Sequence, residues 1–229
     1  MMFLLKDELR GAKNFAFLGE AGCGKSELSM EFALALAALG DRPVHFFDLD
    51  MSKPLFRSRD VCGELERAGV QVHFEEQFMD APTQTGGVSR LLRDRECYVV
   101  LDIGGDYIGA RAVGGYAPLL NAEDTRAYYL INPYRPWSSD LAHIDGVLTQ
   151  VLGVSHIRAD RLRFVANPNF GGMTTEQEVE NGMRALEQTL SGCVTLAFCC
   201  VRAELASAVR VSVPVFPVKL RLTYQWECL

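Results

Sequence analysis

The sequence predicts an α/β protein with three layers, in which a mostly parallel central sheet carries helices on both faces. Short apolar segments with the length of strands alternate with segments of helical periodicity along the whole chain. The first apolar segment runs into a glycine-rich stretch, residues 19–26, that matches the pattern G-x-x-x-x-G-K-[ST]. No linker and no internal repeat divides the 229 residues, so we expect one domain spanning 1–229.

The first half of the chain is expected to contain four strands and three helices. The strands are short apolar runs, and the helices show apolar residues about one turn apart or lie between breaks rich in glycine and proline. In order, these elements are the strand Asn14–Leu18, a helix from Lys25 to Leu39, the strand Val44–Phe47, a helix Arg59–Gly69, the strand Val70–Phe74, a short helix Val88–Arg95 and the strand Cys97–Leu101.

The second half continues the alternation and ends on a strand. In order, we expect the strand Arg126–Ile131, a helix Ser139–Leu152, the strand Leu162–Ala166, a helix Thr174–Leu190, the strand Cys193–Cys199, a short helix Ala203–Val209 and the strand Val218–Trp226. Ser139 is the expected N-cap of its helix, and residues 174–177 nearly match a capping box. Strict alternation of apolar and polar residues over 218–226 predicts a half-buried strand at the edge of the sheet.

Residues 19–26 carry the chemistry of a phosphate-binding loop. Glycines let the backbone N–H groups turn inward and form a concave nest for phosphate oxygens, and the helix that begins at Lys25 adds the positive end of its dipole. Lys25 would reach the terminal phosphates of a nucleotide, and the Ser26 hydroxyl would ligate Mg²⁺. Cys23 lies inside this loop, where we expect a tolerated small residue rather than a redox switch.

Carboxylates follow two further expected strands. Asp48 and Asp50 come directly after the second strand, and Asp102 follows the fourth strand just before a glycine pair that includes Gly105. An acid at a strand end is suited to the Mg²⁺ shell, and a glycine N–H beside it can sense a terminal phosphate. Ligands of parallel sheets bind beyond the carboxyl ends of the strands. We therefore expect these residues, and Asn167 after a later strand, to converge on the phosphate-binding loop.

The composition argues against several kinds of partner. A formal net charge of -6 leaves no global basic footprint, so no nucleic acid is expected. The apolar start of the sequence, Met1–Leu5, is too short for a signal segment or a membrane span, and we expect a cytoplasmic protein with no membrane span. Seven cysteines without a CxxC pair give no sign of a zinc or iron–sulfur site and suit a reducing compartment.

With these elements in order, the chain resembles the MinD/ParA-like branch of P-loop ATPases, which includes nitrogenase iron protein and the CooC-type nickel-insertion ATPases. The resemblance covers nearly the whole chain and rests on Gly19–Ser26, Asp48–Asp50 and Asp102–Gly105. More narrowly, Asp50–Arg59, Gly104–Arg111 and Asn132–Pro136 resemble a little-characterised bacterial subgroup of ATP-binding proteins. The resemblance implies the three-layer P-loop NTPase fold and a nucleotide cycle.

The resemblance also implies a role for each site residue. Lys25 would bind the phosphates, Asp50 would orient the attacking water and Asp102 would be the Walker B acid, so these three are the expected catalytic residues. Mg²⁺ would be held by Ser26, Asp48 and Asp102. The expected contacts with the nucleotide are Gly19, Gly22, Cys23, Gly24, Lys25, Ser26, Glu27, Gly105 and Asn167, with Asn167 and the segment beginning Val201-Arg202 beside the base.

One position departs from this resemblance. ParA-like members usually carry a lysine just after the first glycine of the loop, and that lysine crosses a dimer interface to the partner's nucleotide; here the position is Glu20. Two like unit charges about 4 Å apart cost about 4 kcal/mol at an effective dielectric near 20, so Glu20 should point away from the phosphates. Arg57, Arg59 and Arg111 are the candidates for a substitute cation, although surface arginines are more often simply solvated.

The expected function is a Mg²⁺-dependent ATPase, slow without its partner, that acts as a switch on an unidentified protein. ATP is favoured over GTP because the chain lacks the N/T-K-x-D motif of guanine-specific relatives. A nucleotide-dependent homodimer is one option. Two alternatives stay open: an ATP-dependent maturation factor for a metallo- or redox enzyme, and a small-molecule kinase or ligase of the same superclass. For the second alternative, residues 75–96 and 105–125 are long enough to form an acceptor lid.

Overall fold

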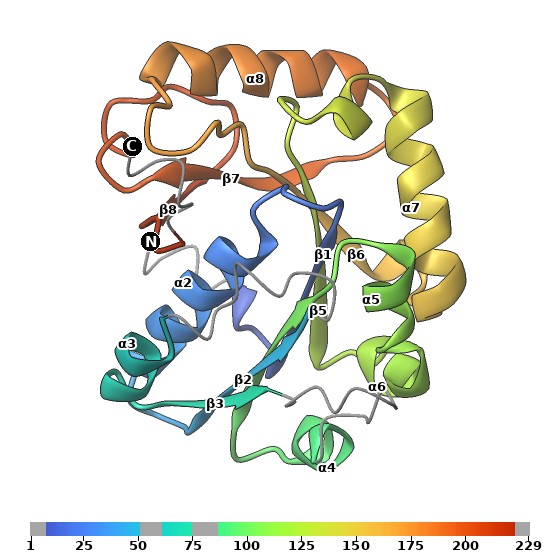
Figure 1. Cartoon of the computed structure of the whole chain (residues 1–229), viewed down its shortest axis with the longest axis vertical. Helices are drawn as coiled ribbons and strands as arrows, with labels where there is room; N and C mark the ends of the chain where they lie inside the picture. The colour runs from blue at the N-terminus through green and yellow to red at the C-terminus, as the bar shows by residue number, and fades with distance from the viewer. Residues whose placement is uncertain (1–7, 51–60, 75–86, 223–229) are drawn as a thin grey trace.

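The computed structural model describes residues 8–50, 61–74 and 87–222, and its centre is one eight-stranded sheet (Figure 1). The strands lie in the order β3-β2-β4-β1-β5-β6-β7-β8, and every pairing is parallel. Their bounds are β1 Asn14–Gly19, β2 Val44–Leu49, β3 Val70–Phe74, β4 Tyr98–Ile103, β5 Thr125–Ile131, β6 Leu162–Ala166, β7 Leu196–Arg202 and β8 Val215–Val218. The expected α/β class and parallel sheet are thereby confirmed.

Helices cover both faces of this sheet. The helices are α2 Lys25–Ala37, α3 Cys62–Arg67, α4 Val88–Arg93, α5 Tyr107–Arg111, α6 Ala117–Leu120, α7 Leu141–Ser155 and α8 Glu176–Thr189, with 3-10 turns η2 Gly114–Tyr116, η3 Pro136–Ser138 and η4 Ala159–Arg161. α2 and α3 pack on one face, and α4 to α8 contribute to the core on the other (Figure 1). The sheet is therefore the middle of three layers.

Aromatic side chains dominate the core between α2 and the sheet. Phe32, on the buried side of α2, lies 4.9 Å from the ring of Phe15 and 5.5 Å from that of Phe17, both on β1. The same ring stacks on Phe216 of β8 at 5.6 Å. Because every one of these side chains is fully buried, α2 is held firmly against the strand that leads into its own N-terminal loop.

The strand order places residues 19–26 at the carboxyl ends of the strands, where parallel sheets bind their ligands. β1 lies between β4 and β5, so the chain leaves β1 towards one side of the sheet and later returns to its other side. Asp48 of β2 is the register partner of Asp102 of β4, and Phe17 of β1 is the partner of Asp102 on the opposite side. The carboxyl ends of β2, β4 and β1 therefore meet next to residues 19–26.

Three expectations for the C-terminal quarter were wrong. β7 begins at Leu196 rather than Cys193, because the N–H groups of Cys193 and Val194 donate to Leu190 O at the end of α8. Residues 203–208 form turns instead of a helix. The last strand, β8, ends at Val218, and residues 219–222 are irregular because their N–H groups bind carboxylates of α2; the rest of 218–226 lies outside the described residues.

Other differences concern helix boundaries. Asp140, not Ser139, caps α7, since its carboxylate accepts from His143 N at 2.9 Å. The capping box of α8 lies one residue later than expected and joins Thr175 with Glu178. α5 and α6 were not expected at all; α5 begins after Asp106, whose carboxylate accepts from Gly109 N at 2.7 Å. The expected start of the helix Arg59–Gly69 lies outside the described residues.

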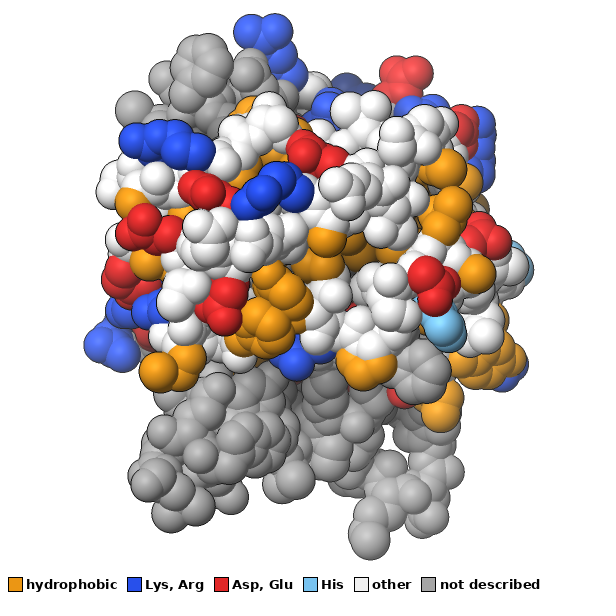
Figure 2. Space-filling view, turned by 90° about the horizontal axis from the view of Figure 1, so that it is seen from above, with side chains coloured by type: hydrophobic (Ala, Val, Ile, Leu, Met, Phe, Trp, Pro, Cys, Tyr) orange, Lys and Arg blue, Asp and Glu red, His pale blue; other side chains and the backbone are white. Residues whose placement is uncertain are grey.

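The face seen in Figure 2 carries charges of both signs in alternation rather than one basic area among its described residues. This distribution agrees with the net charge of -6. Within the described ranges, none of the helices combines the length and the apolar character needed to cross a bilayer.

Candidate functional site

The loop between β1 and α2 has the backbone of a phosphate nest. Gly22 and Gly24 adopt φ angles of 75° and 99°, a region that other residues rarely occupy, and Gly24 is the N-cap of α2. No side chain caps α2, so the first N–H groups of the helix stay available to a ligand at its N-terminus. A Cβ on Gly19 would lie 2.5 Å from Leu130 O, so β5 leaves no room for a side chain there.

The side chain of Lys25 folds back onto the backbone of its own phosphate-binding loop. Its side chain is buried, and its Nζ donates to the backbone oxygen of Glu20 at 2.8 Å. A Cβ on Gly105 would lie only 2.5 Å from this Nζ and 2.6 Å from Ala21 N. The glycine pair after β4 therefore touches the phosphate-binding loop, and only glycine fits at 105.

Three buried carboxylates gather beside the start of α2. Asp48 and Asp102 are register partners on adjacent strands, and Asp50 N donates to Asp48 Oδ1 at 3.1 Å. Asp102 hydrogen-bonds with the Ser26 hydroxyl. Burial, then the charge of Asp48, raises the pKa of Asp102 to about 7, which signals an excess of negative charge at this point.

The residues that could ligate Mg²⁺ fit that ion. Within the described chain, Asp102 Oδ1 is buried and accepts no hydrogen bond. A buried carboxylate oxygen without a donor is well suited to bind a cation. Among the described residues, no three acid, His or Cys side chains converge tightly enough to chelate a metal by themselves. Mg²⁺ is commonly held by one or two carboxylates, a hydroxyl, water and substrate phosphates. Ser26 with Asp102 provides the protein share of such a shell.

Glu20, the position that departs from the resemblance, is buried beside the loop. Its carboxylate hydrogen-bonds with the Ser138 side chain at the end of η3, and Lys25 and Arg135 lie close enough to act on its charge. Burial raises the pKa of Glu20, while the Ser138 hydrogen bond and the two cations oppose this rise. The Glu20 carboxylate is therefore held by a hydrogen bond to η3.

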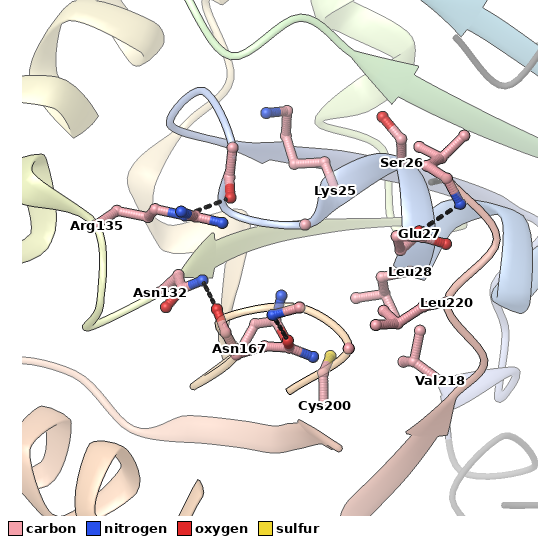
Figure 3. Close-up of a pocket in the computed structure, with 16 residues that line it drawn as sticks. Lys25, Ser26, Glu27, Leu28, Asn132, Arg135, Asn167, Cys200, Val218 and Leu220 are labelled. Atoms are coloured by element: carbon pink, nitrogen blue, oxygen red, sulfur yellow. Dashed lines mark hydrogen bonds between the residues drawn. The ribbon is translucent and has the colours of Figure 1, made fainter. Parts of the chain in front are cut away.

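Two side chains from other strand ends brace the loop. Asn167 Nδ2 donates to Cys23 O at 2.7 Å, and Arg135 Nε donates to Gly22 O at 2.9 Å. In Figure 3 Arg135, Asn132 and Asn167 lie on one side of the pocket beside the loop. The sequence pointed to Asn167 but assigned no role to Arg135, although Arg135 lies inside the stretch Asn132–Pro136 quoted for the resemblance.

A pocket of about 190 Å³ continues from the phosphate-binding loop. Gly24, Lys25, Ser26 and Glu27 line its inner end, and Cys200 lies on its floor. Leu28, Val218 and Leu220 form an aliphatic side opposite Asn132 and Asn167 (Figure 3). The lining is completed by Gly22, Arg135, Asn169, Gly171, Gly172 and Leu222.

Six of the nine expected nucleotide contacts line the pocket: Gly22, Gly24, Lys25, Ser26, Glu27 and Asn167. The carboxylate of Glu27 is occupied there by the N–H groups of Arg221 and Leu222. The other three do not line it: Gly19 and Cys23 are buried, and Gly105 lies against the phosphate-binding loop. The segment that begins at Val201-Arg202, expected beside the base, lines the pocket through Val218, Leu220 and Leu222, while Val201 and Arg202 themselves do not line it.

Of the arginines proposed as substitutes for the missing lysine, Arg111 does not line the pocket. Arg111 is exposed at the end of α5, and Arg57 and Arg59 lie outside the described residues. Arg135 is the arginine that lines the described pocket. No sequence pattern could have identified it, because its place depends on how the turn after β5 packs on the loop.

Comparisons with known proteins bear on the fold. No protein-family model matches the sequence, and no curated protein matches it. Among solved structures, signal recognition particle receptor FtsY from Elizabethkingia anophelis in complex with GDP is 12% identical, with a TM-score of 0.52 over 83% of this chain and 57% of that one. A nucleotide-binding protein from Archaeoglobus fulgidus in complex with ADP is 17% identical over 87% and 85%, with a TM-score of 0.45. FlhF complexed with GTP and Mg²⁺ is 11% identical over 71% and 58%, with a TM-score of 0.45.

At these identities the likeness concerns the fold alone. The match to FtsY shows that the chain has the α/β fold of the P-loop NTPases. The chain spans 57% of FtsY and 58% of FlhF, so it corresponds to only part of those proteins. The finer assignment to the MinD/ParA-like branch stays a prediction.

Proposed function

We propose that this protein is a Mg²⁺-dependent ATP-binding and ATP-hydrolysing switch that acts on a protein partner. The observation that carries the proposal is the meeting of Lys25 and the open N-terminus of α2 with three buried carboxylates at one edge of the sheet. A loop of this kind binds phosphate through backbone N–H groups, and the acids beside it suit Mg²⁺ and an attacking water.

Each side chain of the site has a role in this proposal. Lys25 leaves Glu20 O and binds the terminal phosphates, while Ser26 and Asp102 hold Mg²⁺ and Asp48 supports that shell. When bound, Mg²⁺ neutralises the phosphate charge that develops during transfer. Asp50 orients the attacking water by accepting a hydrogen bond from it. Gly105, in contact with the loop, reports whether a terminal phosphate is present.

Two features of the pocket support adenine rather than guanine as the proposed base. Guanine presents N–H donors at N1 and N2, which a carboxylate binds well, whereas adenine presents one exocyclic amine beside ring acceptors. Among the described lining residues, Glu27 carries the one carboxylate, and its two oxygens already accept from Arg221 N and Leu222 N. The carboxamide oxygen of Asn167 suits the amine of adenine. ATP is therefore the nucleotide we propose.

An exposed apolar pair next to the phosphate sensor supports action on a partner. Tyr107 and Ile108 of α5, directly after the glycine pair, are 52% and 68% exposed. Any shift of Gly105 caused by a terminal phosphate would move these two side chains, because α5 begins only two residues later. Such coupling between a phosphate and a contact surface is how nucleotide switches work.

Two substitutions separate binding from hydrolysis. Lys25→Ala should abolish ATP binding because it removes the cation that faces the phosphates, with an affinity loss of about 100-fold or more. Asp50→Ala should bind Mg·ATP normally and release no phosphate, since the residue acts only on the water. Calorimetric titration measures the first effect and a phosphate-release assay measures the second.

Asp145→Ala, which removes an exposed acid from α7, is the matched control and should change neither quantity. Circular dichroism verifies that all three variants are folded. Tight ATP binding by Lys25→Ala would refute the proposal, and normal turnover by Asp50→Ala would remove this residue from the water-orienting role.

A further inference from the structure

Val218, the last residue of β8, and residues 219–222 cross back from the edge of the sheet to the start of α2; we refer to 218–222 as the strap. Val218, Leu220 and Leu222 line the pocket, whereas the side chains of Lys219 and Arg221 pair with Glu64 of α3. On other sides of the pocket lie Gly171 and Gly172, which have no side chains, and the amides of Asn167 and Asn169. The strap thus contributes three aliphatic side chains to the pocket, next to Leu28 of α2.

Carboxylates of α2 hold the strap through its backbone. Both oxygens of Glu27 accept from Arg221 N, at 3.0 and 2.9 Å, and Oε1 also accepts from Leu222 N at 2.8 Å. One turn further along α2, Glu31 Oε2 accepts from Lys219 N at 3.3 Å. Glu27 directly follows Ser26, so the strap is attached within one residue of the phosphate-binding loop.

Arg221 completes this attachment with its side chain. Its guanidinium pairs with Glu31 of α2 and, through Nε at 3.0 Å, with Glu64 of α3. The Arg221 side chain is only 7% exposed, and that of Glu31 14%. Buried pairs with two partners and a planar donor are geometrically specific, so Arg221 fixes where the strap lies rather than merely adding charge.

We propose that the strap is the base-binding wall of the nucleotide site and that Arg221 is the positioning residue that holds it there. This inference rests on the proposed function and adds a ligand subsite to it. A flat, weakly hydrated purine ring matches a slot with an aliphatic side and a glycine backbone side. The slot is continuous with the loop that takes the phosphates, so one nucleotide can occupy both.

The test compares ATP with inorganic tripolyphosphate, each with Mg²⁺, because the two share the phosphates and differ in the nucleoside. Leu220→Ala should weaken ATP binding about tenfold, the effect of lost aliphatic contact in a binding pocket, and leave tripolyphosphate binding unchanged. Leu141→Ala is the matched control: Leu141 is 41% exposed on α7 and does not line the pocket, so neither ligand should be affected.

Arg221→Gln should reduce the preference for ATP over tripolyphosphate, as Leu220→Ala does. Arg221→Lys should restore part of this preference, because the lysine ammonium group can form one of the two ion pairs that Arg221 makes. If Arg221→Gln is poorly folded by circular dichroism, Leu220→Ala, whose side chain is only partly buried, still decides the question.

The outcomes separate the two proposals. If the wild-type protein binds ATP and Leu220→Ala weakens both ligands equally or neither, the strap is not the base wall, and the proposed function stands. If the wild-type protein binds neither ATP nor tripolyphosphate, the proposed function fails and the inference fails with it.

Discussion

Gly105 illustrates how much of the site depends on single atoms. Gly105→Ala would place a methyl group against Lys25 Nζ and the loop backbone at Ala21, and backbone atoms cannot move aside as a flexible side chain can. We expect this variant to lose ATP binding about tenfold or more, because the glycine pair must withdraw from the loop or the loop must open. Calorimetric titration with Mg·ATP measures the loss.

Gly146 offers a matched control for this substitution. It lies exposed in the middle of α7, and a Cβ there would meet no atom within 4 Å. Gly146→Ala should leave ATP binding intact and raise the free energy of unfolding by about 0.5–1 kcal/mol, since glycine in a helix is less favourable than alanine. Equal ATP affinities for the two variants would contradict a close contact at Gly105.

Residues whose role follows from local spacing could be placed from the sequence. Lys25 and Ser26 belong to a loop whose pattern fixes their positions, and Asp102 follows an unmistakable strand. The attachment of the strap by Glu27 and the role of Arg135 could not be predicted, because each depends on a contact with a distant segment: the strap for Glu27 and the loop backbone for Arg135. Spacing along the chain contains no information about such contacts.

At the scale of elements, a pair of histidines joins two neighbouring strands at one end of the sheet. His45 Nδ1 of β2 and His73 Nε2 of β3 lie 2.9 Å apart, and the His73 ring stacks on Phe47 at 4.4 Å. Burial lowers the pKa of His45, and the charge of Arg90 on α4 lowers it further while Asp94 opposes this. Burial and His45 likewise lower the pKa of His73. The pair is thus most favourable when neutral.

These pKa shifts predict how stability depends on pH. A histidine whose pKa is lower in the folded than in the unfolded chain stabilises the fold above its ordinary value of 6.5 and ceases to do so as the pH falls below it. The melting temperature should therefore drop on acidification from pH 7 into the range where the folded pair is protonated. The melting temperature of the His45→Gln variant should drop less over the same pH range, when each protein is compared with its own value at pH 8. Parallel curves for the two proteins would contradict the prediction.

Strands were easier to predict than the connections between them. β3 and β6 have the expected bounds, because turn residues mark one end of each: Gly69 precedes β3, and Asn167-Pro168 follows β6. The last strand was predicted at the wrong place. Residues 218–222 alternate like a strand, yet their N–H groups bind side chains of α2 instead of a neighbouring strand. α5 and α6 are too short for helical periodicity to reveal them.

For the whole molecule, the proposed switch predicts a change of mass with nucleotide. Asp50→Ala should bind ATP without hydrolysing it, so Mg·ATP should double its mass in light scattering if two copies meet through the exposed side chains of α5. Ile108→Asp, added to this variant, should keep it monomeric, because a charge at a contact between apolar side chains is costly to bury. A monomeric mass with ATP bound would exclude the homodimer and leave a different protein as the partner.

The position of β1 has a consequence for how the protein forms during synthesis. β1 leaves the ribosome well before its neighbours in the sheet, β4 and β5, which begin only at Tyr98 and Thr125. A parallel strand in the centre of a sheet gains its hydrogen bonds only when both neighbours are present. During synthesis, the phosphate-binding loop therefore lacks the support of β5 until residues 125–131 have been made.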